Sequence, residues 1–472
     1  MSDSDLETAD TEALAPAVTR LDEDDRLRPE FVSEVLDRVE AGDHDGVRAL
    51  VEPLHPADIA DLFELVDSGD RRALAAAVAD LLDGDVLAEM NDWVREELLD
   101  ELEPHEVAEI AGELETDDAV ALIEDMEEEE QRAVLRALDP DDRAAIEEAL
   151  SYPEETAGRL MRRDAVAVPE HWTVGDVINY LRGQEELTTD FWEVFVVDPA
   201  HRPVGTCLLS WILRTPRRIA VADVMQREQT LIPIDMDQEE LALRFQKYAL
   251  ISAAVVDPAG RLVGMITADD VVHIIQEEAS EDALLLSGAG YEGDINEPVA
   301  DSYRARVKWL AANLLTALVA STIIYMFGAA IEQMVALAVL MPIVASIGGN
   351  AGTQTMAVSV RALAMNQLTR SNTWRTITRE ISVALLNGLT IALLLGLGAG
   401  LVFGNVQLGA VIAAAMLINI LVAGLSGVVV PVVLERSGQD PAVSSSVFVT
   451  MITDSMGFFV FLGLAVATGL VG

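Results

Sequence analysis

Long uncharged runs occupy the last third of the chain. Residues 309–331, 333–360, 381–434 and 441–472 contain a single charged residue, Asp454. A helix crosses the roughly 30 Å core of a bilayer with about 20 apolar residues, so each run is long enough to span it. The run 381–434 is too long for one helix, and its polar residues 404–407 divide it into 381–403 and 408–434. The pattern predicts five spans in a membrane domain, 308–472.

The second of these spans has an unusual composition. Its 28 residues would form a helix of about 42 Å, which exceeds a straight crossing and implies a tilt or a break. Pro342 and the glycines at 348, 349 and 352 favour a break in the helix, because irregular backbone at that depth must line a cavity. The alternative is close helix packing through Gly348 and Gly352, which are four residues apart.

Short helices are predicted before the membrane domain, over residues 29–150. Apolar positions recur at helical spacing, and Pro29, Pro56, Pro104 and Pro140 each stand where a helix would begin. Stacked short helices of this kind form a superhelical domain. Residues 1–28 are acidic and poor in large apolar groups, so we expect them to be disordered.

Residues 151–280 alternate predicted strands and helices and contain an internal repeat. Residues 195–199 and 202–205 (FVVDP, RPVG) match residues 254–258 and 261–264 (AVVDP, RLVG), with an offset of 59. Two α/β modules in tandem are therefore expected, at 151–220 and 221–280, and they are similar to a pair of CBS modules. Residues 281–307 would form the connecting helix region: an acidic helix end is separated by a Gly-rich stretch, 287–293, from a possible helix that starts at Val299 and leads into the first span.

Charge separates the chain into two parts. Residues 1–300 carry 74 acidic and 23 basic residues, whereas residues 301–472 carry 6 and 8. Such self-repulsion is tolerated where molar salt screens charge, so we expect a halophile and regard most acids as solvated surface.

The single cysteine, Cys207, excludes a disulfide framework, and the acidic start is no secretory signal. No nucleic-acid partner is expected.

Basic residues fix the expected orientation in the cell membrane. Arg361, Arg370, Arg375 and Arg379 lie between the second and third spans, and further basic residues precede the first span. The positive-inside rule places both segments in the cytoplasm. The N-terminus is then cytoplasmic, and five crossings leave the C-terminus outside.

Asp454 is predicted to be the one acid well inside a span. An intramembrane carboxylate costs about 3 kcal/mol on insertion scales and is typical of an ion path. Neighbouring hydroxyl and amide groups are hard ligands that suit Mg²⁺ or Ca²⁺, and all histidines lie outside the membrane domain. Mg²⁺ keeps several waters and needs one or two carboxylates, so one aspartate per chain suffices in a symmetric homodimer.

Four segments together resemble the MgtE family of magnesium channels. They are residues 152–161 (YPEETAGRLM), 342–354 (PIVASIGGNAGTQ), 440–442 (DPA) and 454–457 (DSMG). The resemblance implies a homodimer with a helical N domain, tandem CBS modules, a plug helix and five spans. It also implies Mg²⁺ uptake that stops when Mg²⁺ binds between the cytosolic domains.

The resemblance also implies roles for particular residues. The predicted ion path contains Asp454, Asn350, Gly348, Gly349 and Gly457. Ala121, Ala249 and His273 stand where the family often has acids, so we expect weaker inhibition by metal. The acids at the family's regulatory metal positions are Asp117, Asp237, Glu239, Asp270, Glu278, Glu281, Asp282 and Asp440.

Other ligands and functions remain open at this point. Thr267 and Asp270 have a Thr-x-x-Asp spacing that suits ATP or another adenine nucleotide in the second module. A coupled divalent-cation exchanger and a non-conducting membrane-tethered CBS sensor are the alternatives to a channel. An enzyme is not expected. An intramembrane aspartyl protease would need two facing acids, and Asp454 is the one acid predicted deep in a span.

Overall fold

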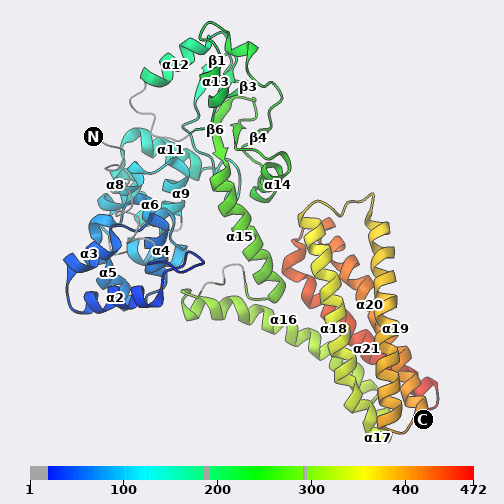
Figure 1. Cartoon of the computed structure of the whole chain (residues 1–472). Coiled ribbons are helices and arrows are strands. Elements are labelled where there is room, and N and C mark those ends of the chain that lie inside the picture. Colours follow the sequence, from blue (N-terminus) through cyan, green and yellow to red (C-terminus); the bar gives the residue numbers. More distant parts are fainter. Residues whose placement is uncertain are drawn as a thin grey trace, which may run out of the picture. The chain divides into compact units, whose positions relative to one another are not determined.

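The computed structural model describes residues 20–100, 102–124, 126–183, 191–290, 293 and 295–471 (Figure 1). The chain divides into two compact units, Met1–Ile274 and Ile275–Gly472. We refer to them as the N-terminal unit and the C-terminal unit and describe each by itself.

The N-terminal unit begins with a domain of short helices around one apolar core. Four of these helices begin at the predicted prolines, and aspartates cap others: the Asp43 carboxylate accepts the Gly46 N–H at 3.1 Å. The helices are α2 (Pro29–Glu40), α3 (His44–Val51), α4 (Pro56–Glu64), α5 (Ser68–Ala77), α6 (Gly84–Ala88), α7 (Asp92–Leu99), α8 (Pro104–Glu113), α9 (Thr116–Glu124), α10 (Glu128–Ala137) and α11 (Pro140–Leu150).

The acidic segment before α2 differs from the expected disorder where the structure describes it. Residues 1–19 lie outside the described residues. Leu21 and Leu27 form an isolated antiparallel bridge, and Leu27 is buried in the core of the helical domain. The Arg20 guanidinium lies 5.7 Å from the centre of the Phe31 ring. Two leucines and an aromatic contact therefore order residues 20–28 despite their acidic neighbours.

Two α/β modules follow, and they repeat one topology. In each sheet the central strand pairs parallel with the first strand and antiparallel with the third. The register shifts at Val196/Val197 and again 59 residues later, at Val255/Val256. The elements are β1 (Ala167–Pro169), α12 (Val174–Gly183), β2 (Glu193–Val197), β3 (Pro203–Leu208), α13 (Leu209–Arg214), β4 (Leu231–Pro233), α14 (Gln238–Tyr248), β5 (Ser252–Val256), β6 (Leu262–Thr267) and α15 (Ala268–Ser287).

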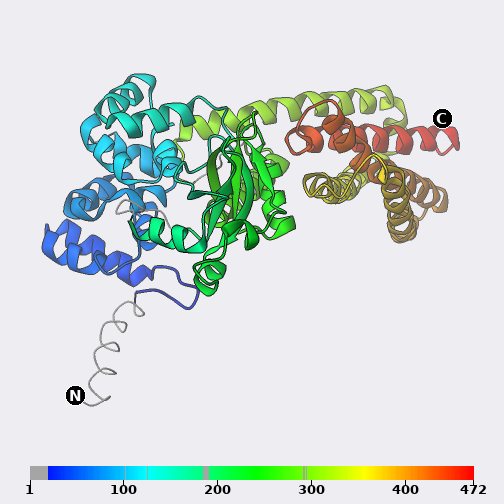
Figure 2. The same cartoon turned by 90° about the horizontal axis from the view of Figure 1, so that it is seen from above.

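The segment entering each module pairs with the sheet of the other one. Arg162 exchanges backbone hydrogen bonds with Met265 of β6, and Gln226 does the same with Thr206 of β3. Met161 accordingly lies in the core of the second module. Figure 2 shows the green strands beside the blue-to-cyan stack of short helices. Arg162 is thus fixed to the second module although it precedes the first in sequence.

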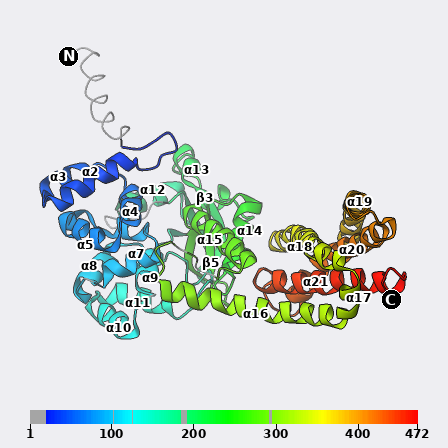
Figure 3. The same ribbon diagram turned by 90° about the horizontal axis from the view of Figure 1, so that it is seen from below.

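The C-terminal unit contains five helices long and apolar enough to cross a membrane, which confirms the predicted number of spans. Helix α20 packs against α18, α19 and α21, and α16 lies along α21 (Figure 3). The helices are α16 (Val299–Met326), the short α17 (Gly328–Gln333), α18 (Val335–Ala364), α19 (Thr373–Val402), α20 (Val406–Arg436) and α21 (Pro441–Ala467).

The predicted break in the second span is wrong. Helix α18 continues through Pro342 and through all three glycines. The glycines serve helix packing instead: a Cβ on Gly348 would lie 2.2 Å from Asn419 Nδ2, and one on Gly352 would lie 2.6 Å from Val449. Neighbouring helices and tight packing hold such a helix together in a membrane protein.

The connecting region 281–307 is not one continuous helix, because it is interrupted at glycines of the predicted Gly-rich stretch. Helix α15 runs to Ser287 and ends at Gly288 and Gly290, whose φ angles of +75° and +113° favour glycine. Helix α16 then begins after Pro298 and passes residue 308 without interruption. No structural boundary separates the connector from the first span.

The contact between α19 and α20 depends on the absence of a side chain at Gly409. A Cβ at this position would lie 2.5 Å from the carbonyl oxygen of Gly396. We predict that Gly409→Ala lowers the stability of the unit by about 1–3 kcal/mol, because the backbones must separate. A clear drop in the apparent unfolding temperature of the protein in detergent would show this effect.

Gly398→Ala is the matched control. Gly398 lies in α19, one of the two helices that form this contact, but a Cβ there would meet nothing within 4 Å. Its unfolding temperature should equal or exceed that of the wild type, since alanine favours a helix over glycine. Equal unfolding temperatures for the two variants would contradict this account of the packing.

Candidate functional site

Asp454 lies in the middle of α21 and is half-buried. Thr453 beside it is fully buried, and the buried hydroxyl of Ser455 has no hydrogen-bond partner. Within the described residues, no side-chain hydrogen bond or ion pair involves Asp454. The carboxylate is therefore positioned in a spanning helix without a counter-charge from the described part of its own chain.

The other predicted ion-path residues fall into two groups. Gly348 and Gly457 are buried on either side of Asn419 in α20: a Cβ would lie 2.2 Å and 2.7 Å, respectively, from Asn419 Nδ2. Gly349 is half-buried and Asn350 is exposed, and a Cβ on Gly349 would meet nothing within 4 Å. Gly348 and Gly457 thus serve internal packing, whereas Asn350 belongs to an open face of α18.

Sequence reasoning missed Asn419. Its side chain is fully buried, Nδ2 donates to the Val344 carbonyl at 3.1 Å, and Oδ1 has no partner. A buried amide oxygen without a donor is costly unless a ligand or water reaches it. The sequence held a signal, because Asn419 is the one amide in the apolar run 408–434.

A second buried acid, Glu380, lies close to the start of the third candidate span, next to the arginines that precede the apolar run. It lies in α19, which is a candidate span from Thr373 to Val402, and is 6% exposed. The neighbouring Arg379 pairs with it. Both line a cavity of about 210 Å³ with the amides of Gln354 and Asn387. The predicted span began at residue 381 and so omitted this acid.

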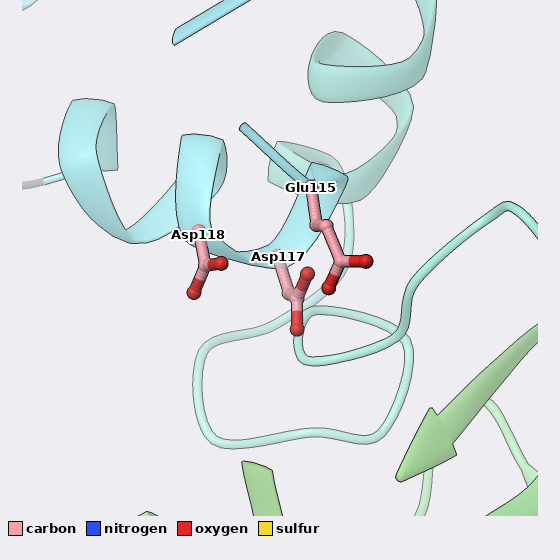
Figure 4. A group of neighbouring side chains, drawn as sticks. All are labelled: Glu115, Asp117 and Asp118. Carbon is pink, nitrogen blue, oxygen red and sulfur yellow. The ribbon is translucent and has the colours of Figure 1, made fainter. Parts of the chain in front are cut away.

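Three acids meet at the start of α9 in the N-terminal unit (Figure 4). Glu115, Asp117 and Asp118 each offer a carboxylate oxygen, and these oxygens lie within 4.8 Å of one another. Burial raises the pKa of Glu115 to about 7. Burial, followed by repulsion from Asp270, raises the pKa of Asp117 well above its usual value. Sequence reasoning had selected Asp117 alone of the three.

Arg162 joins this group to two acids of the second α/β module. Its guanidinium pairs with Glu115, lies 3.2 Å from Asp117 Oδ2 and 3.1 Å from Asp269 Oδ2, and also pairs with Asp270. The structure thus brings the predicted residues Asp117 and Asp270 to one arginine. Arg162, Glu115 and Asp269 were missed, because only the fold places them together.

This group of acids fits a divalent cation in its donor chemistry. Carboxylate oxygens are the ligands that Mg²⁺ prefers. Asp117 Oδ1 is buried and has no hydrogen-bond partner, so one oxygen remains available beside the arginine. The five acids of the group are Glu115, Asp117, Asp118, Asp269 and Asp270.

A second pair of predicted acids meets in the C-terminal unit. Asp282, near the end of α15, has its pKa raised by burial and by the nearby charge of Asp440. Asp440 caps α21, where its Oδ1 accepts the Ala442 N–H at 2.7 Å. Glu278 and Glu281 lie half-buried on α15 beside Asp282.

Leu285 connects this pair to two spanning helices. It is 1% exposed and packs in a cluster with Met356 and Val360 of α18 and Ala442 and Val449 of α21. The end of α15, which carries Leu285 in its last turn and Asp282 one turn earlier, is therefore held against the helices that contain Asn350 and Asp454.

The remaining predicted residues lie at two helix starts. Asp237 and Glu239 are exposed, and Asp237 Oδ1 accepts the Glu239 N–H at 2.9 Å as the cap of α14. Asp270 Oδ2 accepts hydrogen bonds from the Thr267 amide and hydroxyl, at 3.1 and 2.6 Å. The Thr-x-x-Asp pair is therefore committed to its own turn, and nucleotide binding there stays a prediction.

Known protein families match three parts of the chain. Residues 341–464 match the MgtE family, described as a divalent cation transporter. Residues 54–155 match the MgtE intracellular N domain, and residues 221–277 match the CBS domain.

Individual relatives and one solved structure are similar to this chain. The magnesium transporter MgtE of Thermus thermophilus is 34% identical over 319 residues, covering 66% of this chain and 70% of that protein. The protein of the same name from Bacillus subtilis is 28% identical over 318 residues, covering 67% and 70%. The cytosolic domain of the Mg²⁺ channel MgtE in complex with ATP is 30% identical, with a TM-score of 0.47, and covers 52% of this chain and 99% of that chain. The matched helical, CBS and membrane regions and the identity to the Thermus protein show that this chain belongs to the MgtE family of divalent cation transporters.

Proposed function

We propose that this chain is a Mg²⁺-selective channel or transporter that takes up magnesium across the cell membrane. The observation that carries the proposal is Asp454, a half-buried carboxylate in the fifth candidate span. An acid at such depth is costly and is expected to face an ion path. Relatives that carry the name magnesium transporter support Mg²⁺ as the transported ion.

The ion path is proposed to lie between two copies of the chain. Hydrated Mg²⁺ is held by one or two carboxylates, and each chain supplies one Asp454. A twofold axis would place two such groups opposite each other. The exposed Asn350 on α18 is available to the same face as a polar ligand for the water shell of the ion.

The proposed orientation follows from the distribution of charge. Arginines at both ends of the segment between α18 and α19 favour the cytoplasmic side. The acidic N-terminal unit is then cytoplasmic and the end of α21 is outside. In this arrangement the pair Asp282 and Asp440 lies at the cytoplasmic ends of the spans.

Closure is proposed to follow from Mg²⁺ binding to the acids outside the membrane. Asp282 and Asp440 repel each other without metal, as the raised pKa of Asp282 indicates. A divalent ion between them would fix the end of α15 against α18 and α21 through the Leu285 cluster. High cytosolic Mg²⁺ would thereby hold the spanning helices in a closed arrangement.

Neutralising Asp454 tests the ion path. We predict that Asp454→Asn lowers Mg²⁺ influx into proteoliposomes at least about tenfold. A loss of about 1.4 kcal/mol in the attraction between the ion and this side chain is enough for a tenfold change. The charge of a divalent ion near a carboxylate is worth more than this in a protein interior. Glu332→Gln, an exposed acid in α17, is the control and should transport like the wild type.

Influx through Asp454→Asn that matches the wild type would reject the proposed path and favour a membrane-tethered CBS sensor. The same liposomes distinguish a channel from a coupled exchanger. Influx that requires an opposing proton or Na⁺ gradient would identify an exchanger.

Asp282→Asn tests closure. We predict that the cytosolic Mg²⁺ concentration for half-maximal closure rises about tenfold, because one carboxylate of the bridging pair is lost. A titration of channel current against Mg²⁺ on the cytosolic face measures it. Glu435→Gln changes the charge of a nearby exposed acid and should leave the titration unchanged. Identical curves for Asp282→Asn and the wild type would exclude this pair from closure.

A further inference from the structure

One guanidinium connects the helical domain to the second CBS module. Glu115 and Asp117 belong to the start of α9, whereas Asp269 and Asp270 belong to the first turn of α15. The Arg162 side chain pairs with all four, and its side chain is 11% exposed. The acids of two different domains thus share one positive charge supplied by the chain itself.

The backbone around Arg162 holds the side chain in a fixed place. Its N–H donates to the Met265 carbonyl, and the Met265 N–H donates to the Arg162 carbonyl, both at 2.8 Å. A Cβ at the adjacent Gly264 would lie 2.6 Å from the Arg162 carbonyl oxygen, so glycine permits this close pairing. Arg162 therefore behaves as part of the second module that reaches toward the helical domain.

The charge of the group explains what Arg162 does. Five carboxyl groups share this one guanidinium, so without it those that are ionised would repel one another across the two domains. Removing one partner of a buried ion pair is strongly destabilising, because the remaining charges lose their compensation. The arginine occupies the place between apposed acids where a bridging cation would otherwise be required.

We propose that Arg162 is a built-in counter-charge that holds the helical domain against the second CBS module without metal. Mg²⁺ then tightens an arrangement that already exists, through groups that Arg162 leaves unsatisfied, such as Asp117 Oδ1. The role assigned to Mg²⁺ rests on the proposed function, whereas the metal-free contact does not. The consequence is a regulatory unit whose domains stay together at low Mg²⁺.

The test measures the distance between the two domains in the full-length protein. Spin labels are placed on cysteines at Glu40 in α2 and Gln246 in α14, both exposed, in a Cys207→Ala background that removes the native cysteine. Pulsed electron resonance gives the distance distribution in EDTA and during a Mg²⁺ titration. Singly labelled protein identifies distances between copies.

We expect a single narrow distance distribution for the parent protein in EDTA. Arg162→Gln should broaden and lengthen this distribution in EDTA and regain the parent distance on addition of Mg²⁺, which also shows that the variant is folded. Arg162→Lys keeps the charge and should keep at least part of the population at the parent distance. Arg244→Gln removes one positive charge from an exposed pair with Glu240 and should match the parent.

Two results would overturn the proposal. One is an EDTA distance for Arg162→Gln equal to that of the parent, and the other is a parent protein that is already open in EDTA. Mg²⁺ closure of the channel is measured separately by current. A channel that ignores Mg²⁺ while the EDTA distance depends on Arg162 would reject the proposed closure and leave this inference standing.

Discussion

A carboxylate that leaves water requires a counter-charge, a proton or a bound cation, and this requirement shapes both units of the protein. The chain has far more acids than bases, and many acids among the described residues are exposed. The informative ones are those that the fold removes from water. Each is stabilised in a different way, and the difference indicates what each region does.

In the N-terminal unit the counter-charge comes from the chain itself. Arg162 faces acids of the helical domain and of the second module, and the exchange of entering segments between the modules brings it there. In the C-terminal unit, Glu380 has Arg379 as its partner. Asp454 has no such partner among the described residues, which is the property expected of a group that receives its cation from outside.

The helices of the C-terminal unit form a frame that depends on small residues. Gly348, Gly352, Gly409 and Gly457 each permit a neighbour to approach closer than a Cβ would allow. Lipid gives helices little hydrophobic reason to associate, so close packing of this kind holds the bundle together. Leu285 links this frame to the acidic end of α15, so that charge there and the position of α18 and α21 are mechanically connected.

Much of this architecture was predictable from local patterns. Run length gave the number of spans, prolines gave the starts of α2, α4, α8 and α11, and the 59-residue repeat gave two equal modules. These features follow from properties of short segments, namely helix period, hydrophobic length and the missing N–H of proline. The break expected at Pro342 failed because neighbouring helices, which a local pattern does not contain, keep α18 continuous.

The sequence by itself determined the number of candidate spans, the order of the domains and the position of Asp454 within a span, because an acid in a long apolar run is visible without any fold. Only the tertiary structure decided which charges meet. Arg162 and Asp117 are 45 residues apart, Arg162 and Asp269 are 107 apart, and Asn419 reaches Val344 across 75 residues. Coulomb and hydrogen-bond energies depend on distance in space, and chain folding sets that distance independently of separation in sequence.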